Sequence, residues 1–455
     1  QASCSSNSGS IALHAGACMP LSVKRWLPMW CLPPRLLWAA SAAGNQLNYG
    51  IIFDAGSSGT RLHVYAWHGS AKLGDFKLIE DDLMKVQPGL SSFANNPEAA
   101  GSSLGPLLAH AKEKVPAEQR AATPAFLMAT SGLRLLGSDV SKAIIRSAGN
   151  SLAASPFAFK PGWASIISGV EEGLFGWVAV NFLLGTLFGG KATSAEQALS
   201  RPSTNGIIDL GGGSVQIAYA VPPDFAPTEL FSGNVSFAGQ VHRLHVRSHL
   251  HFGLDEARAR VEQNLARGAD GGTPVVHPCL PLGHRALSRS GSEFVGSGDH
   301  ESCVNLHANL FRACGKTPCL QDGVSQAPPM PASLLGFSYI YDRTRGVGLL
   351  DGDCQPFGNQ TASVAQLREA AARLCMLSPT EAQKRAAGCG EFEKWSNFCG
   401  DAVYITVLLE HGFGIDASKP LTMANKVAGV ELVWTLGAVI VNADALAQHG
   451  ERDEL

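Results

Sequence analysis

The sequence has no block of basic residues and few charged residues overall. Charged side chains make up 16% of the 455 residues, and the formal net charge is -3. Because nucleic-acid binding needs a basic patch or stripe, nucleic acid is not expected as a partner. The chain also lacks the long run of like charges that is typical of a disordered acidic tail. The hydrophobic fraction of 45% is ample for packed cores in about two or three domains.

Cysteine is absent between Cys31 and Cys279, which divides the 11 cysteines into two groups. The later group is even in number, which indicates disulfides made in an oxidising compartment, with reduced buried thiols as the alternative. Spacing does not assign the pairs, although Cys314 and Cys319 are close enough to close a small loop. No Cys-x-x-Cys pair stands with a His pair at zinc spacing, so a zinc site is not expected. The later group comprises Cys279, Cys303, Cys314, Cys319, Cys354, Cys375, Cys389 and Cys399.

No clear membrane-spanning run of about 20 apolar residues is present. Residues 1–45 are expected to be a leader, because Lys24 and Arg25 precede a short apolar stretch that ends in small residues. Pro33, Pro34 and Arg35 interrupt that stretch. A cleaved signal peptide fits this pattern, and an uncleaved membrane anchor or an organelle transit peptide is the alternative. Membrane contact is expected only if the leader is such an anchor.

The last four residues, Arg452 to Leu455, nearly match the retrieval signals of the endoplasmic reticulum. Two sequons, at Asn234 and Asn359, are consistent with a glycoprotein of the secretory pathway. We therefore predict a location in the lumen of the endoplasmic reticulum or Golgi, with a retrieval receptor as a partner. A secreted protein, or one anchored to the membrane and facing the lumen, is the alternative.

Two segments of similar design predict an internal repeat. Tyr49–Trp67 and Gly206–Ala220 each predict two strands joined by a glycine-rich turn, which in both cases follows an aspartate at the end of the first strand. A repeat of this kind favours an α/β fold with two similar lobes that face a cleft.

Other patterns predict the remaining elements less specifically. Helices are expected over 97–120, 133–150, 166–184, 363–374, 401–410 and 427–447, strands over 125–129, 337–341 and 346–350, and loops over 191–205 and 268–300. Glu431 and Asp444 indicate that the last helix is a core helix rather than a membrane span.

An aspartate followed by glycines at a strand end is suited to phosphate chemistry. Glycine has no side chain, so its backbone N–H groups can approach phosphate oxygens, and serine or threonine hydroxyls add donors. The aspartate can hold Mg²⁺ or Ca²⁺ through water, since both ions prefer oxygen ligands. One such turn is weak support, because it can be an ordinary hairpin turn. Two such turns, each between strands, are strong support for a phosphate site.

The sequence around these turns resembles a known family. DAGSSGTRLHVYAW from Asp54, ATSGLRLL from Ala129, GVEEGLFGW from Gly169 and IDLGGGSVQ from Ile208 are similar to successive apyrase motifs. Ala424-Asn-Lys426 and Trp434 to Ala438 are similar to the closing motif. The chain is thereby identified as a member of the ecto-nucleoside triphosphate diphosphohydrolase (apyrase) family over roughly residues 48–442. Phe175, where many relatives carry Tyr, and Gly213, where Ala is common, depart from the pattern without disturbing it.

The resemblance implies a fold of two RNase-H-like lobes, as in the actin, Hsp70 and sugar kinase superfamily, with a nucleotide cleft between them. The expected boundaries are residues 46–165 plus 432–455 for the first lobe and 166–431 for the second, which carries disulfide-rich insertions.

The resemblance also implies roles for single residues. Glu172 would be the general base that takes a proton from the attacking water, and Glu171 a solvated carboxylate at the start of a helix. Asp54 and Asp209 would hold a divalent cation, Mg²⁺ or Ca²⁺, through water; turn capping is the alternative. Phosphate contacts are implied for Gly56, Ser57, Ser58, Gly59, Thr60, Arg61, Thr130, Gly211, Gly212, Gly213, Ser214 and Gln216.

Alternatives stay open for several of these residues. Thr130 can be a helix N-cap, Gln216 can lie on a strand surface, and Arg61 and Arg134 can simply pair with carboxylates. Base stacking is implied for Tyr339, Tyr341 and Tyr404, with core aromatics as the alternative.

The predicted activity is hydrolysis of the terminal phosphate of nucleoside di- or triphosphates, with a preference for UDP and GDP suggested by the luminal location. A broad apyrase that cleaves ATP and ADP is the first alternative. A sugar kinase of the same superfamily or a nucleotide-binding, chaperone-like module are the others; Glu172 argues against both, since neither needs a base for water.

Overall fold

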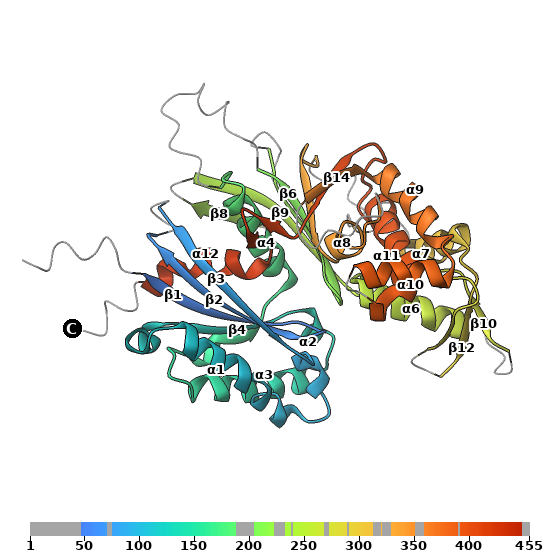
Figure 1. Ribbon diagram of the computed structural model, residues 1–455. Coiled ribbons are helices and arrows are strands. Elements are labelled where there is room, and N and C mark those ends of the chain that lie inside the picture. The colour runs from blue at the N-terminus through green and yellow to red at the C-terminus, as the bar shows by residue number, and fades with distance from the viewer. Residues whose placement is uncertain are drawn as a thin grey trace, which may run out of the picture. The chain divides into compact units, whose positions relative to one another are not determined.

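The computed structural model describes most of the chain from residue 47 to residue 447 (Figure 1). The chain divides into the units Gln1–Asn45 and Gln46–Leu455. The predicted leader, the tail Arg452–Leu455, Cys314 and Cys319 lie outside the described residues. The structure describes residues 47–70, 75–187, 204–222, 233–237, 240–267, 273–288, 291–312, 320, 329–350, 359–389 and 392–447.

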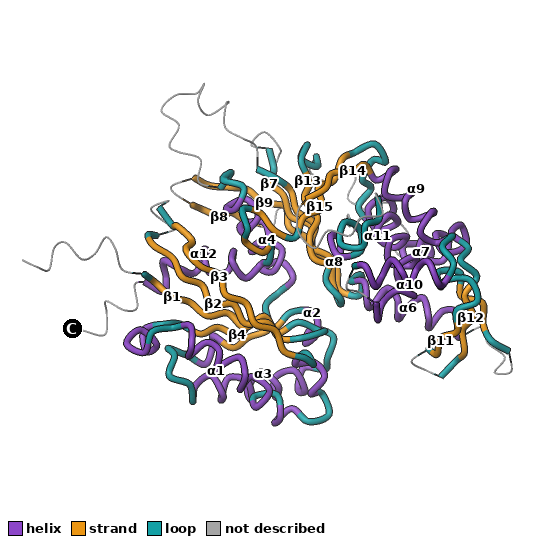
Figure 2. The backbone as a smooth tube through the Cα atoms, in the orientation of Figure 1, coloured by secondary structure: helices purple, strands orange, loops and turns teal. Residues whose placement is uncertain are grey.

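Two mixed sheets with related strand orders organise the second unit (Figure 2). The first sheet has the order β3 (Lys77–Val86), β2 (Thr60–His68), β1 (Asn48–Ala55), β4 (Ala125–Ala129), β5 (Ala164–Ile166). The second sheet has the order β14 (Asn359–Ser363), β15 (Pro420–Ala424), β13 (Leu334–Ser338), β6 (Gly206–Leu210), β7 (Ser214–Ala220), β9 (Gln240–Leu250), β8 (Gly233–Phe237).

The two predicted hairpins occupy equivalent places in these sheets. β1 pairs antiparallel with β2 and parallel with β4. In the same way, β6 pairs antiparallel with β7 and parallel with β13. The internal repeat inferred from the sequence is therefore confirmed as a repeat of strand order.

The helices cover both sheets in layers. Their bounds are α1 (Gly105–Lys114), α2 (Ser131–Arg134), α3 (Ser138–Ala153), α4 (Gly169–Leu183), α6 (Leu254–Ala266), α7 (His300–Arg312), α8 (Tyr339–Asp342), α9 (Val364–Cys375), α10 (Pro379–Gly388), α11 (Phe398–Val407) and α12 (Trp434–Ala447). Short 3-10 helices span Leu90–Phe93, Pro97–Ala99, Ser102–Leu104, Ala117–Ala122, Pro161–Trp163 and Phe392–Asn397, and a π-turn spans Leu408–Gly412.

Strand alternation distributes the apolar residues among three hydrophobic cores. In β1, Ile51 and Phe53 pack with residues of α1 and α3, whereas Ile52 packs on the opposite face with α4 and α12. In β6, Ile207 contributes to the same core as α4 and α12, whereas Ile208 faces the outer helices. The helix pair α4 and α12 therefore supplies a core that both sheets share, which Figure 1 shows as two helices between the sheets.

Several predicted elements have different bounds in the structure. The helix expected over 97–120 is wrong in extent, because only Gly105–Lys114 is α-helical and short 3-10 helices flank it. The helix expected over 133–150 is interrupted before Ser138. The strands expected over 337–341 and 346–350 are also wrong: β13 ends at Ser338, and residues 346–350 form turns.

Two further corrections concern the C-terminal half. The loop expected over 268–300 contains a small sheet, β10 (Val275–His277), β12 (Glu293–Gly296) and β11 (Arg285–Leu287). The last helix starts at Trp434 rather than 427, because β16 (Lys426–Val427) and β17 (Val430–Glu431) form a hairpin before it. Most of the loop expected over 191–205 lies outside the described residues. Within the described residues, no helix is long and apolar enough to cross a membrane.

The disulfides predicted from the cysteine pattern are present in the second half of the chain. Cys279 pairs with Cys303, and Cys375 pairs with Cys399. The alternative of reduced buried thiols is therefore wrong for these four residues.

The contact between α4 and α12 depends on one glycine. A side-chain carbon at Gly437 would lie 1.8 Å from the carbonyl oxygen of Phe175, so only glycine allows the helices to approach this closely. Since the Phe175 backbone is held within α4, neither helix can relax without disturbing the shared core.

We expect the substitution Gly437→Ala to destabilise the protein by about 1–3 kcal/mol, because it overpacks the contact between α4 and α12. Chemical denaturation monitored by circular dichroism measures this change. Gly105→Ala is the matched control, since Gly105 is also helical and nothing lies within 4 Å of the added carbon. Equal stabilities of the two variants would contradict the role of Gly437.

Candidate active site

The two predicted aspartates lie at equivalent ends of the two central strands. Asp54 is the penultimate residue of β1, and Asp209 is the penultimate residue of β6. Both are 5% exposed. Because β4 and β13 run parallel to these strands, Thr130 and Ser338 come to the same strand ends. The fold thus brings together residues that the sequence separates widely.

The two glycine-rich turns approach each other closely. A side-chain carbon at Gly212 would lie 2.7 Å from the Ser57 hydroxyl oxygen, and one at Gly132 would lie 2.9 Å from the Ser57 Cα. A side-chain carbon at Gly213 would lie 2.8 Å from the Ser131 hydroxyl oxygen. Glycine is required at these positions because the first turn, the second turn and α2 meet with almost no space between them.

The backbone of both turns offers unused donors. Among the described residues, the N–H groups of Ser57, Ser58, Gly59, Gly212 and Gly213 donate no hydrogen bond, whereas that of Gly211 donates to the Ser214 carbonyl at 3.0 Å. Neighbouring N–H groups without partners form a suitable site for an anion. Ser58 is exposed and Ser57, Gly211 and Gly212 are half-buried, so solvent reaches part of this surface.

Glu172 is held by a buried hydrogen-bond network that joins α2, α4 and β7. Its Oε2 accepts a hydrogen bond from Arg134 at 2.7 Å and one from the Gln216 side chain at 3.1 Å. Arg134 also donates to the Ser214 hydroxyl at 3.0 Å, and Gln216 donates to it at 2.8 Å. No hydrogen bond reaches Oε1 of Glu172 from the described residues, so this oxygen stays available for another partner.

The neighbouring Glu171 has a different role. Its side chain accepts a hydrogen bond from the Ser168 N–H at 2.7 Å, and its own N–H donates to the Ser168 hydroxyl at 3.1 Å. This capping box begins α4 and leaves Glu171 exposed, whereas Glu172 points inward and is 7% exposed. The structure therefore separates a helix cap from a buried carboxylate at adjacent positions.

Burial raises the pKa of Glu172 to about 7, although the positive charge of Arg134 opposes the shift. Burial likewise raises the pKa of Asp209 to about 6, against a hydrogen bond from Ser338, and the negative charge of Asp54 raises it further. Three carboxylates therefore disfavour one another's charge in a poorly solvated region. A cation placed among them would offset this repulsion.

Asp54 has an oxygen with no protein partner. Its Oδ2 pairs with Arg61 at 3.2 Å, whereas its buried Oδ1 accepts no hydrogen bond. The buried hydroxyl of Thr60 also has no partner. Asp54 and Asp209 belong to no compact group of three ligating side chains among the described residues. These carboxylates fit a hard divalent cation that keeps several waters in its coordination shell.

The remaining candidates are placed as follows. Gly56 lies in the first turn, and Thr130 is the N-cap residue of α2 without a side-chain capping bond. Gln216 is buried rather than on a strand surface. Arg61 and Arg134 both pair with carboxylates.

The three tyrosines differ in accessibility. Tyr341 and Tyr404 are 2% and 0% exposed within the core of the outer helices, and the Tyr404 hydroxyl donates to the Phe252 carbonyl at 2.6 Å. Both rings are enclosed by protein side chains, which favours the alternative of core aromatics. Only Tyr339 is half-buried, with Arg343 over its ring at 5.4 Å.

Two residues at the site are not predicted from the sequence. Ser248 on β9 accepts a hydrogen bond from Gln216 at 3.0 Å, and Ser338 bonds to Asp209. Ser338 has a positive φ of 54°, an uncommon conformation for a residue other than glycine. Neither serine stands in a recognisable motif, because strand pairing alone brings each to the site.

Comparisons with known proteins agree with this geometry. A model of the GDA1/CD39 (nucleoside phosphatase) family matches residues 41–451. Probable apyrase 1 of Oryza sativa subsp. japonica is 32% identical over 459 residues, covering 95% of this chain and 88% of that protein. Guanosine-diphosphatase of Schizosaccharomyces pombe (strain 972 / ATCC 24843) is 33% identical over 428 residues, covering 86% of this chain and 72% of that protein.

A solved structure of similar fold comes from another organism. The crystal structure of nucleoside triphosphate hydrolases from Neospora caninum aligns with a TM-score of 0.63 at 15% identity, covering 88% of this chain and 94% of that chain. At this identity the likeness concerns the fold alone. Together with the two mixed sheets, it confirms the predicted α/β fold with two lobes.

We expect Glu172→Gln to stabilise the metal-free protein increasingly as the pH rises from 5 to 8. The unfolded chain releases the Glu172 proton near pH 4.5, whereas the folded chain holds it to about pH 7. Above both values the wild type buries a charge, so its free energy of unfolding falls by about 3 kcal/mol relative to the amide variant.

Denaturant titrations in EDTA across this pH range measure the difference. Glu171→Gln is the control, because it removes an exposed carboxylate from the adjacent position. A stability difference between Glu172→Gln and wild type that does not change with pH would show that Glu172 is not a buried titrating group.

Proposed function

The chain belongs to the GDA1/CD39 (nucleoside phosphatase) family and is a nucleoside phosphatase, and we propose that it favours nucleoside diphosphates, UDP and GDP, with Glu172 as its general base. The observation that carries the assignment of the base is the buried network around Glu172. Arg134 and Gln216 hold one carboxylate oxygen and leave the other for a water molecule. A base works best when its pKa lies near the working pH, and a value of about 7 meets this condition.

The residues of the two turns account for substrate binding. Phosphoryl transfer depends on positioning and charge neutralisation rather than on covalent chemistry with the protein. The unpaired N–H groups of Ser57, Ser58, Gly59, Gly212 and Gly213 are oriented by tight turns to receive phosphate oxygens. Glu172 then takes a proton from the attacking water at Oε1, while Arg134 and Gln216 fix the direction of the carboxylate.

Enzymes of this family depend on a divalent cation. We propose that Asp54 and Asp209 hold it through water, because the partnerless Oδ1 of Asp54 and the mutual repulsion of the carboxylates favour a cation there. When bound, the ion offsets the negative charge of the phosphates. Either Mg²⁺ or Ca²⁺ suits these oxygen ligands.

The preference for diphosphates is supported by similarity and by location. The relative from Schizosaccharomyces pombe is named a guanosine-diphosphatase, whereas the relative from rice is named a probable apyrase. A luminal enzyme would meet nucleoside diphosphates, the products of glycosyltransferases. A broad apyrase that cleaves ATP and ADP is the second candidate. Tyr339 is the tyrosine that we propose for base stacking, since Tyr341 and Tyr404 are enclosed in the core.

We expect purified protein to release phosphate from UDP and GDP faster than from ADP, ATP and UTP in the presence of Mg²⁺ or Ca²⁺. EDTA should abolish release, and Glu172→Gln should lower kcat by about 10²–10⁴-fold because the water loses its base. A phosphate-release assay over all five nucleotides measures these values.

Two variants serve as comparisons in the same assay. Glu171→Gln should keep activity, since Glu171 only caps α4. Tyr339→Ala should raise the KM without a matching loss of kcat if its ring holds the base. Full activity of Glu172→Gln would refute the proposed base, and much faster cleavage of ATP than of UDP and GDP would refute the diphosphate preference.

We also propose that the protein enters the secretory pathway and is retained in the lumen. The disulfides Cys279–Cys303 and Cys375–Cys399 are typical of an oxidising compartment. Asn359, the first residue of β14, is exposed and can carry a glycan. The segment Arg452–Leu455 would bind a retrieval receptor.

Deletion of residues 452–455 should shift the protein from cell extracts to the medium, because retrieval would be lost. Immunoblotting of cells and medium measures the distribution, and digestion with an endoglycosidase reports glycosylation of both forms. An unchanged distribution after the deletion would exclude the retrieval signal.

A further inference from the structure

The first sheet carries a groove on its outer face, the face that packs on α1 and α3. A cavity of about 450 Å³ lies between α3 and β5, the last strand of that sheet. Figure 1 shows α3 and α12 on opposite faces of the sheet. Small-molecule sites typically measure about 300–1,000 Å³, so the cavity is large enough for a ligand. None of its lining residues belongs to the glycine turns or to the network of Glu172.

The floor of this groove is apolar. Three half-buried side chains, those of Ile145, Phe159 and Ile166, pack against the core of α1 and α3 and also line the cavity. Ala164 completes the floor and is 7% exposed. Apolar surface that stays wet in a concave site gains free energy when an apolar ligand covers it. The floor therefore favours a ligand with an apolar body.

Gly149 keeps the floor of the groove open. It lies inside α3, where glycine is less favourable for helix stability than alanine. A side-chain carbon at Gly149 would lie 3.5 Å from the Ala164 Cβ and 3.6 Å from the Phe159 Cζ, which are ordinary contacts. Packing therefore does not require glycine here, in contrast to Gly437. What glycine provides is space, because a longer side chain would extend into the cavity.

One rim of the groove is positively charged. Lys142, Arg146 and Asn150 follow one another at intervals of four residues, so they form one row along α3. All three are exposed, and all three line the cavity. The side chains of Lys142 and Arg146 form no ion pair or hydrogen bond within the described part of the chain, and no described aspartate or glutamate lines the cavity. Both cations are therefore available to an anionic group.

We propose that this groove binds a free fatty acid, with the alkyl chain on the apolar floor and the carboxylate at Lys142 and Arg146. The lining residues of α3 run from Lys142 to Ala153, which is about 16 Å of helix, so an extended chain can lie along it. Burial of the chain supplies binding free energy. The two cations select an anion over a neutral or cationic amphiphile of the same length. The proposal does not depend on the activity of the distant active site.

The first test compares ligands of one chain length and different charge on the full-length protein. Isothermal titration calorimetry measures the affinity of wild type for dodecanoate below its micelle concentration. Dodecylamine and dodecanol are the cationic and neutral controls. We expect dodecanoate to bind at least about tenfold more tightly than dodecylamine, because the rim carries two unpaired positive charges.

The second test uses variants with matched controls. Gly149→Leu fills the cavity, and Gly105→Leu changes another helical glycine, with nothing within 4 Å of the added carbon. Lys142→Gln removes one rim cation, and Lys112→Gln removes an exposed lysine of α1 outside the lining. We expect dodecanoate binding to weaken at least about tenfold in Gly149→Leu, for steric reasons, and about two- to fivefold in Lys142→Gln. The controls should match wild type, and circular dichroism checks the fold of all four variants.

The third test locates the ligand directly. A dodecanoate that carries a photoreactive diazirine at the end of its chain is bound to wild type and irradiated. Mass spectrometry of the digested protein then identifies the labelled peptides. We expect labels within residues 142–153 and 159–166, and excess dodecanoate should prevent them.

These measurements decide the proposal. Equal affinity for dodecanoate and dodecylamine would overturn it, as would unchanged binding by Gly149→Leu or labels confined to other parts of the chain. A dimer in sedimentation that Gly149→Leu dissociates would instead assign the groove to a second copy of this chain. If Gly149→Leu does not fold, Lys142→Gln and the labelling of wild type still support or overturn the site.

Discussion

The arrangement of the active site depends on the buried hydrogen-bond network that Arg134 makes with Glu172 and Ser214. A carboxylate loses much of its hydration on burial, so it persists there only with hydrogen bonds and an opposite charge close by. Arg134 follows the first sheet's β4, Ser214 begins the second sheet's β7, and Glu172 belongs to the helix between the sheets. The buried carboxylate of Glu172 is therefore fully hydrogen-bonded by this network only when both sheets are in place.

The same constraint explains why motifs far apart in sequence act together. Each motif forms one local feature: a turn that leaves N–H groups unpaired, a helix that begins with a capping box, or a strand with aspartate as its penultimate residue. Parallel pairing of β1 with β4 and of β6 with β13 places the ends of these elements side by side. Catalytic geometry thus arises from sheet topology rather than from any single segment.

Sequence reasoning succeeds where the signal is local. The hairpins at Asp54 and Asp209 could be predicted, because in each a glycine-rich turn stands directly between two short runs of strand-forming residues. The distinction between Glu171 and Glu172 also follows from one local motif. Ser248 and Ser338 could not be predicted, because only the register of β9 and β13 brings them to the site.

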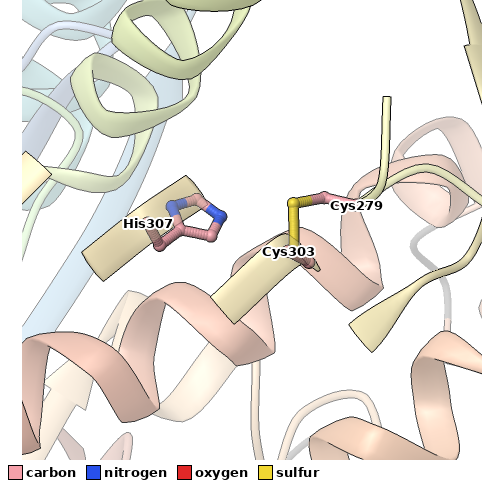
Figure 3. Close-up of side chains that lie close together, drawn as sticks. All are labelled: Cys279, Cys303 and His307. Carbon is pink, nitrogen blue, oxygen red and sulfur yellow. A yellow bond between two sulfur atoms is a disulfide. The ribbon is translucent and has the colours of Figure 1, made fainter. Parts of the chain in front are cut away.

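The same limit explains the errors in the C-terminal half. The hairpin at Lys426 and the small sheet of β10, β11 and β12 are short strands whose residues carry little periodicity. Tyr341 and Tyr404 resemble binding aromatics in sequence, but their burial depends on helices that pack from distant positions. His307 likewise lies beside the Cys279–Cys303 disulfide only through packing, since Cys279 and Cys303 are separated by 24 positions (Figure 3).

The core shared by α4 and α12 has a consequence for how the molecule loses its structure. Each sheet packs one face on this helix pair and the other face on helices of its own, so one of the two cores of each sheet is shared with the other sheet. Loss of either sheet would expose apolar surface on the helices that support the other. The second unit should therefore melt in one cooperative transition despite its two-sheet architecture, and its repeated halves are partners in folding rather than independent domains.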